Sequence, residues 1–343
     1  MQQASILGDG KGGEFPDAGF LNCKGQGEQS KEKGTEIEQD LSFSTCWNAA
    51  RHSSGRAVAE EIMELGFRRI ELSHGLNAAM VQDFLKSKEE LGFEVSSLHC
   101  FCPHPPEIRG DNPDCYEFTS DSPERRNRAI KLAIQTVEMA ARFGAPCVVI
   151  HGGRIRSLDA TKRLRQMVLE GKLLGKDYAA EKLQAVVKRE AAGPKYLKRT
   201  LDALQKIAAH AGQHGIILGI ENRDDYEAVP SEREMEVLFR RLGAPNVGYW
   251  HDFGHAQLKH NMGLLNHAQW LEAIGDRAVG CHVHDVEWPF GDHQAPFRGE
   301  VAFEKLVLSL PRHIQYVFEI SPAVEASAIR DAAARWRELF LKR

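Results

Sequence analysis

Short runs rich in β-branched and aromatic residues alternate with amphipathic stretches along the chain from Leu41 onward. In four of these stretches apolar residues recur every three or four positions and a glycine follows, which is typical of a helix and its C-cap. The four stretches are 54–66, 77–92, 125–144 and 231–243. The eight strand-like runs are LSFSTCW (41–47), FRRIEL (67–72), FEVSSLH (93–99), PCVVIH (146–151), GIILGIE (215–221), VGYWHD (247–252), AVGCHVH (278–284) and QYVFEI (315–320).

This repeated order of strand and helix predicts a parallel sheet of the α/β class. Eight such units match a closed (β/α)8 TIM barrel, which usually needs about 250 residues. A doubly wound open sheet is the alternative. No GxGxxG sequence follows the first run, so a dinucleotide-binding fold has little support.

Two segments depart from this order. Residues 1–40 are rich in Gly, Lys, Glu and Gln, and they cannot bury enough apolar surface to offset the entropy of ordering. We therefore expect a flexible N-terminal tail ahead of one barrel domain, 41–343. Residues 155–192 are charged and strongly helix-forming, and we interpret them as a helical insertion after the fourth strand. A lid, an oligomer contact and a solvated excursion without a role remain open for it.

Composition narrows the class of protein. Hydrophobic residues make up 42% and charged residues 27%, which is ordinary for a soluble globular protein. The net charge of −4 disfavours a nucleic-acid backbone as the main partner. The seven cysteines form no CxxC pair, which predicts reduced thiols and a cytoplasmic location. No apolar run is long enough for a membrane span, and no secretory signal is visible.

Polar residues end most of the predicted strands. In a barrel the carboxyl ends of the strands converge on one mouth, where active sites are built. The residues concerned are His99, His151, Glu221, Asp252 with His255 after it, His282 and His284 with Asp285 next, and Glu319.

The two glutamates are the most informative members of this set. Glu221 lies in ILGIENR and Glu319 in VFEI, and burying a carboxylate beside such apolar residues is costly unless it meets a cation or donors. Two buried glutamates across a barrel would repel each other without a positive charge between them, which a divalent metal supplies. Two Glu, one Asp and one His form an oxygen-rich shell that suits Mn2+, Mg2+ or Co2+, and further histidines favour Zn2+. We expect Mn2+ first.

Four segments together resemble the xylose isomerase-like TIM barrel superfamily, in particular its sugar phosphate isomerase/epimerase family. They are GIENRDD, HDFGHAQL, HVHDVEWPFGDHQAPFRGEVAF and VFEIS. The superfamily shares its architecture with metal-dependent apurinic-site endonucleases. The resemblance covers the chain from about Leu41 to its end, apart from the insertion, and it is specific for the superfamily but not for a substrate.

The resemblance implies a site, residue by residue. The metal ligands it implies are Glu221, Asp252, His284 and Glu319. The catalytic residues are Glu221 and Glu319, as a metal-bound acid/base pair, and His255. The expected substrate-binding residues are His99, His151, His255, His293, Arg298 and Trp47, with Trp250 and Trp288 as further candidates to line the pocket. His282 and Asp285 are expected to support the ligands from behind.

The function implied is a metal-dependent isomerase or epimerase that acts on a sugar or sugar derivative through an enediolate. A lyase or dehydratase of the inosose or 3-keto-glycoside type could use the same enolate. A zinc-dependent phosphodiesterase like the apurinic-site endonucleases is a further alternative, although the expected Asp-x-His is replaced here by adjacent Asp292 and His293. A barrel that only binds a sugar or partner is the non-catalytic alternative. The expected partner is a small carbohydrate, and members of the superfamily are often dimers or tetramers.

Overall fold

The computed structural model describes residues 40–110 and 112–341 of the chain. These described residues all belong to one unit of the chain. Residues 1–39 of the predicted tail lie outside the described residues, so the expectation of a flexible segment there stays a prediction.

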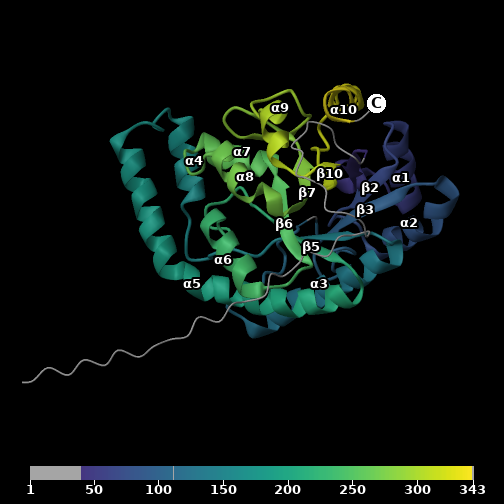
Figure 1. Cartoon of the computed structure of the whole chain (residues 1–343), viewed down its shortest axis with the longest axis horizontal. Coiled ribbons are helices and arrows are strands. Elements are labelled where there is room, and N and C mark those ends of the chain that lie inside the picture. Colours follow the sequence, from purple (N-terminus) through teal and green to yellow (C-terminus); the bar gives the residue numbers. More distant parts are fainter. Residues whose placement is uncertain (1–39, 111, 342–343) are drawn as a thin grey trace, which may run out of the picture. The chain divides into compact units, whose positions relative to one another are not determined.

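Eight parallel strands close into a barrel in the order β1-β10-β7-β6-β5-β4-β3-β2, with helices around it (Figure 1). The barrel closes where Ser42 and Phe43 of the first strand pair with Val317 and Phe318 of the last. The strands are β1 (Ser42–Ser44), β2 (Arg69–Leu72), β3 (Glu94–His99), β4 (Cys147–Ile150), β5 (Ile217–Glu221), β6 (Val247–Asp252), β7 (Ala278–Val283) and β10 (Gln315–Phe318). The predicted (β/α)8 barrel is confirmed.

The four helices predicted from their apolar spacing are present. They are α1 (Gly55–Glu64), α2 (Ala78–Leu91), α3 (Pro123–Phe143) and α6 (Glu232–Leu242). Each begins after a Ser or Asn whose side chain accepts a backbone N–H, as an N-cap does. The other helices are α4 (Thr161–Leu169), α5 (Lys176–Gln213), α7 (Phe253–Asn261), α8 (His267–Ile274), α9 (Phe303–Leu306) and α10 (Ala326–Phe340), and the short 3-10 turns are η1 (Thr45–Trp47), η2 (Ala49–Arg51), η3 (Gly275–Arg277) and η4 (Val307–Ser309).

Below the mouth, the interior of the barrel is filled by a small apolar layer. Trp250 is fully buried there with Cys147, Val149 and Val317. The indole fits because β7 carries a glycine beside it: a Cβ on Gly280 would lie 2.1 Å from Trp250 Cζ3. The layer supports the polar side chains above it, and the ring of His282 lies 5.2 Å from that of Trp250.

Two elements extend the simple barrel. The insertion consists of α4 and the first part of α5, a helix of 38 residues that continues past Pro194 into the barrel's outer layer. Helices α4 and α5 stand beside the barrel strands in Figure 1. After β7 the chain forms an antiparallel hairpin, β8 (Asp285–Glu287) and β9 (Gly291–Gln294), which the sequence patterns did not predict.

Two further observations on the described residues concern the cysteines and the apolarity of the helices. No disulfide joins the cysteines among them, which are Cys46, Cys100, Cys102, Cys115, Cys147 and Cys281. In the same part of the chain, no helix combines the length and the apolarity that a membrane crossing requires.

The start of the insertion is held by one buried carboxylate. Glu227 accepts hydrogen bonds from the backbone N–H of Ala160, from the backbone N–H of Thr161 at 2.9 Å, and from the Thr161 hydroxyl. Further along, Arg189 of α5 donates to the carbonyls of Tyr226 and Ala228, each at 2.7 Å. The insertion is therefore fixed to the segment that follows β5.

Replacing Glu227 by Gln should lower the free energy of unfolding by about 1–3 kcal/mol, because one buried acceptor is exchanged for a donor. Urea unfolding followed by circular dichroism measures the difference. Glu236→Gln changes an exposed carboxylate of α6 and is the matched control. Equal midpoints for the two variants would contradict this anchoring role.

Candidate active site

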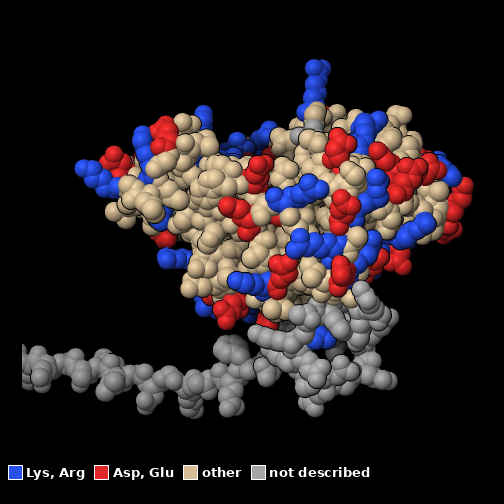
Figure 2. Space-filling model, turned by 90° about the horizontal axis from the view of Figure 1, so that it is seen from above, with Lys and Arg blue, Asp and Glu red and all other residues tan. Residues whose placement is uncertain are grey.

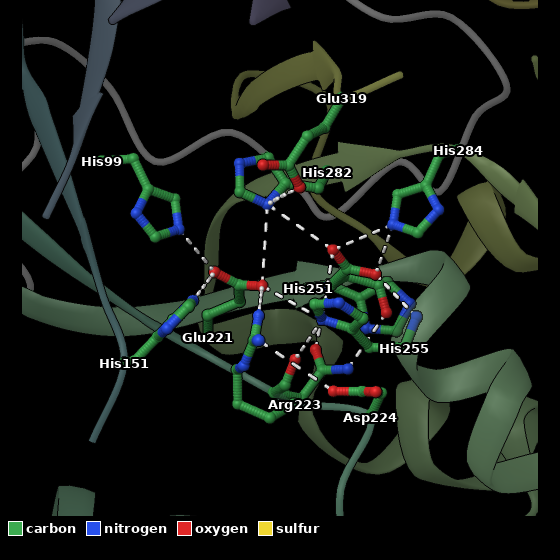
Figure 3. A network of polar contacts seen from close by, with 12 residues as sticks. His99, His151, Glu221, Arg223, Asp224, His251, His255, His282, His284 and Glu319 are labelled. Carbon is green, nitrogen blue, oxygen red and sulfur yellow. Dashed lines mark hydrogen bonds and ion pairs between the residues drawn. The ribbon is translucent and has the colours of Figure 1, made fainter. Parts of the chain in front are cut away.

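Side chains from the carboxyl ends of the barrel strands meet at one mouth, as Figure 3 shows. Glu221 ends β5, Asp252 ends β6, and Glu319 directly follows β10. All three carboxylates are buried, at 1%, 0% and 6% exposure. The convergence expected from the sequence is thus present, and the question is which positive charge stabilises these groups.

His282 of β7 is the imidazole at the centre of the three carboxylates. Its Nδ1 lies 3.1 Å from Glu319 Oε2, 3.6 Å from Asp252 Oδ2 and 3.8 Å from Glu221 Oε1. Its Nε2 lies 3.2 Å from Glu71 Oε2. With the Nε2 proton donated to Glu71, the lone pair of Nδ1 would face the three carboxylates. A metal-binding histidine commonly has such a carboxylate on its other nitrogen.

The donor set fits a divalent ion. Glu221, Asp252 and His282 each offer a ligand atom within 4.8 Å of the others, and Glu319 joins His282 in a second such group. Burial would lower the pKa of His282, but Glu319 and Glu71 raise it well above its usual value. These carboxylates therefore favour a positive charge at this point, and a proton or a bound cation can supply it.

His284, the ligand implied by the resemblance, is less well placed than His282. Its Nε2 lies 3.0 Å from Asp252 Oδ1, but its Nδ1 is directed to Asp292 at 3.2 Å. It is still close enough to Asp252 and Glu319 to share an ion with them. His284 is placed differently from His282 because β7 ends at Val283, so His284 lies beyond the strand. Its ring packs against α7, where a Cβ on Gly254 would lie 2.0 Å away from it.

The two histidines at the end of β7 thus have different surroundings, and both lie in groups that could hold an ion. His282 faces the three carboxylates, and His284 stacks on His293 with ring centroids 4.1 Å apart. Asp285, expected to support the ligands, accepts the backbone N–H groups of Gly299 and Val301 at 2.8 and 3.0 Å. It fixes the loop after the hairpin.

His99 and His151 approach the centre from β3 and from the end of β4. Both direct Nε2 to Glu221 Oε2, at 3.1 and 3.0 Å. His151 also contacts Asp114 through Nδ1 at 2.7 Å. Burial and Arg223 would lower the pKa of His151, but Asp114 and Glu221 raise it to about 9.

His255 and His293 complete the cluster on the other side. His255 Nδ1 lies 3.1 Å from Glu221 Oε1 and 3.3 Å from Asp252 Oδ2. His293 Nε2 lies 3.7 Å from Glu319 Oε2, and its backbone has a φ of 53°, a strained left-handed conformation for this residue. His255, His284 and His293 form a further group of donors within 4.8 Å.

The carboxylates remain ionised in this setting. Burial would raise the pKa of Glu221, but the imidazoles around it, foremost His151, hold it well below its usual range. Burial likewise opposes ionisation of Asp252 and Glu319, yet His255 and His282 respectively keep the pKa of each low. The imidazoles around the three carboxylates thus favour their ionised forms.

Two expected substrate-binding residues are not brought to the cluster. Trp47 is buried, donates its Nε1–H to the Val324 carbonyl at 3.0 Å, and carries the Arg51 guanidinium 3.9 Å above its ring. The ring is thereby occupied on that face. Arg298 is exposed, and within 40–110 and 112–341 no hydrogen bond or ion pair joins it to the histidines.

Four polar residues of the cluster were not predicted as members: Glu71, Asp114, Arg223 and Asp292. Glu71 lies between Ile70 and Leu72 in the predicted strand FRRIEL, so the argument used for Glu221 and Glu319 applies to it as well. Arg223 follows Glu221 by two positions, and its Nη1 lies 3.4 Å from Glu221 Oε1. Asp114 comes from the loop between β3 and α3, for which no strand periodicity gives a position.

Comparisons with known proteins agree with this architecture. Similar solved structures include a D-tagatose 3-epimerase-like protein (16% identity, TM-score 0.61, 88% of this chain and 95% of the other). They also include 3-keto-D-glucoside 4-epimerase YcjR from E. coli (17%, 0.61, 88% and 100%) and an L-ribulose 3-epimerase (15%, 0.57, 88% of each chain). At these identities the likeness establishes the fold.

Two further comparisons concern the sequence. The uncharacterized protein y4fM from Sinorhizobium fredii (strain NBRC 101917 / NGR234) is 25% identical over 193 residues, or 56% of this chain. The match spans about half of that relative, 52% of its length. The family described as "Xylose isomerase-like TIM barrel" matches residues 59–339. The chain therefore belongs to the xylose isomerase-like TIM barrel family.

Proposed function

We propose that the protein is a metal-dependent isomerase or epimerase that acts on a sugar or sugar derivative. The observation that carries the proposal is the convergence of three buried carboxylates, Glu221, Asp252 and Glu319, on Nδ1 of His282. The epimerases among the similar solved structures support the reaction class.

These four side chains would hold one divalent ion, with Mn2+ as the first expectation and Mg2+, Co2+ or Zn2+ as alternatives. Such an ion supplies Lewis acidity, which polarises a carbonyl and stabilises the negative charge of an enediolate. Glu71 keeps His282 in the tautomer that offers Nδ1.

Glu221 and Glu319 are proposed as the acid/base pair. They come from β5 and from the end of β10, strands separated in the barrel by β6 and β7, so they approach a sugar from different sides. One carboxylate takes the proton from the carbon beside the carbonyl, and the other, or the same one, returns it. Return to the opposite face of that carbon gives an epimer, and return to the neighbouring carbon gives an isomer.

The surrounding imidazoles would position the substrate. His255 lies beside both Glu221 and Asp252, and His293 lies beside Glu319, so their free edges can donate hydrogen bonds to hydroxyl groups. His99 and His151 fix the orientation of Glu221. If the carbon next to the enediolate carried a leaving group, the same residues would give a lyase, with His151 or His293 protonating that group.

One observation supports a second candidate, a zinc-dependent phosphodiesterase. The mouth holds three adjacent donor groups, and together they offer ligands for more than one ion: His99, His151 and Glu221; Glu221, Asp252 and His282; His255, His284 and His293. Against it, Lys and Arg are interspersed with Asp and Glu on the face shown in Figure 2, and the net charge is −4. A DNA backbone favours a continuous basic surface. A small carbohydrate partner, a cytoplasmic location and a dimer or tetramer remain predictions.

Alanine at His282 should weaken binding of Mn2+ to protein stripped with EDTA by about 100-fold or more, since a ligand is lost and not merely its support. The matched variant His284→Ala should weaken the tightest site by less than tenfold. Titration calorimetry measures both, and thermal unfolding confirms that each variant is folded. The reverse order of affinities would assign the ligand position to His284.

Glu221→Gln should abolish proton exchange at the substrate while the barrel stays folded, because the amide cannot accept the proton. Uptake of deuterium from D2O into a panel of ketoses, ketose phosphates, inososes and 3-keto glycosides, followed by NMR, measures the exchange. Treatment with EDTA should stop it, and added Mn2+ or Co2+ should restore it. Exchange that survives EDTA would contradict the metal-dependent scheme.

Elemental analysis after dialysis should find one divalent ion per chain. A sugar isomerase of the proposed kind needs one, whereas hydrolysis of a phosphodiester would employ the other two donor groups as well. Three zinc ions per chain, with cleavage of abasic DNA, would favour the phosphodiesterase instead.

A further inference from the structure

Beside the mouth lies an open hollow of about 450 Å³ that the proposed chemistry does not use. Its walls come from four segments: the connection between α4 and α5, helix α7, the turn of the β8–β9 hairpin and the loop after it. The lining residues are Leu173, Gln257, His260, Asn261, Trp288 and Glu300.

Both main walls of the hollow begin in the site itself. Helix α7 starts next to Asp252 and carries His255, and the six residues from there to Asn261 rise by about 9 Å. The hairpin starts next to His284, and the four residues to Trp288 span at most about 13 Å. Both walls are thus joined to residues of the carboxylate cluster by segments no longer than about 13 Å.

Trp288 is the residue of the hollow with an unusual exposure to solvent. It is 50% exposed, whereas Trp47, Trp250, Trp270 and Trp336 are buried. An exposed indole offers a flat apolar face together with a donor N–H, a combination that suits contact with an amphipathic ligand. The other walls are mostly polar, so the hollow does not suit a purely apolar ligand.

The turn that carries Trp288 is held in place. Asn261 donates to the Pro289 carbonyl at 3.0 Å and accepts from Gln257 at 2.9 Å, which ties the turn to α7. Phe290 packs on the apolar cluster around Met262, and Arg165 lies 5.4 Å above its ring. The indole is thus presented by a fixed support, which reduces the entropy lost on binding.

The insertion forms a further wall of the hollow. Tyr178 of α5 donates its hydroxyl to the Met262 carbonyl at 2.6 Å, and Leu164, Val168 and Leu173 pack into the same cluster. The insertion is therefore docked against the end of α7, where it supplies one wall of the hollow. This is a more specific role than a solvated excursion.

We infer that the hollow is a second sugar subsite, so that the substrate is a glycoside or disaccharide whose reacting unit occupies the carboxylate cluster and whose neighbouring ring stacks on Trp288. This inference rests on the proposed function for the identity of the first unit. His260 and Glu300, which are both exposed, supply a donor and an acceptor of the kind that ring hydroxyls require.

The test compares the Mn2+-loaded full chain binding D-fructose with the same chain binding maltulose, turanose and isomaltulose, which are keto-disaccharides that contain fructose. Titration calorimetry should give at least one disaccharide an affinity about tenfold or more above that of fructose. Trp288→Ala should bring that ratio close to one. Leu174→Ala, which removes a side chain 99% exposed next to Leu173, should leave the ratio unchanged.

Equal affinities for all four sugars, absence of binding by any of them, or a ratio insensitive to Trp288→Ala would overturn the subsite. Deuterium uptake from D2O into the same sugars separates this inference from the proposed function. A disaccharide preference in binding without exchange would retain the subsite and reject the isomerase. Exchange into fructose and disaccharides at equal kcat/KM, unaffected by Trp288→Ala, would retain the isomerase and reject the subsite.

Discussion

The burial of carboxylates at the barrel mouth is the constraint on which the rest of this site depends. Glu71, Glu221, Asp252 and Glu319 are almost fully withdrawn from water. Such groups are tolerated only where cations or strong donors meet them. The surrounding imidazoles stabilise these carboxylates in part, and three of the carboxylates converge on His282 Nδ1. A divalent ion at this point would complete the charge balance, and it would also provide the chemistry.

The barrel explains how residues so far apart in the chain reach one point. Parallel strands in register bring their carboxyl ends to a single rim, as the pairing of Asp252 with His282 illustrates. The hairpin after β7 adds His293, and α7 adds His255. The insertion is fixed by Glu227 and Arg189 and forms a wall farther out. Reaction and substrate selection would therefore lie on different layers of the same mouth.

The barrel and the carboxylates at its mouth could be predicted from the sequence, because strand-like and helix-like runs alternate along the chain. Glu221 and Asp252 end apolar runs that can only be strands, and Glu319 stands at the end of another, so a barrel brings them together. The choice between His282 and His284 could not be made in this way. It depends on where β7 ends and on the contact between His282 and Glu71, which lie more than 200 residues apart. Asp114 and the hairpin lie in connections, where no spacing rule applies.

Crystals of the protein grown with Mn2+ and measured for anomalous scattering would test the central claim most directly. The account predicts a strong peak within ligand distance, about 2.0–2.4 Å, of carboxylate oxygens of Glu221, Asp252 and Glu319 and of His282 Nδ1. A peak bound by His255, His284 and His293 alone, or no peak at the mouth with Mn2+ in excess, would contradict it.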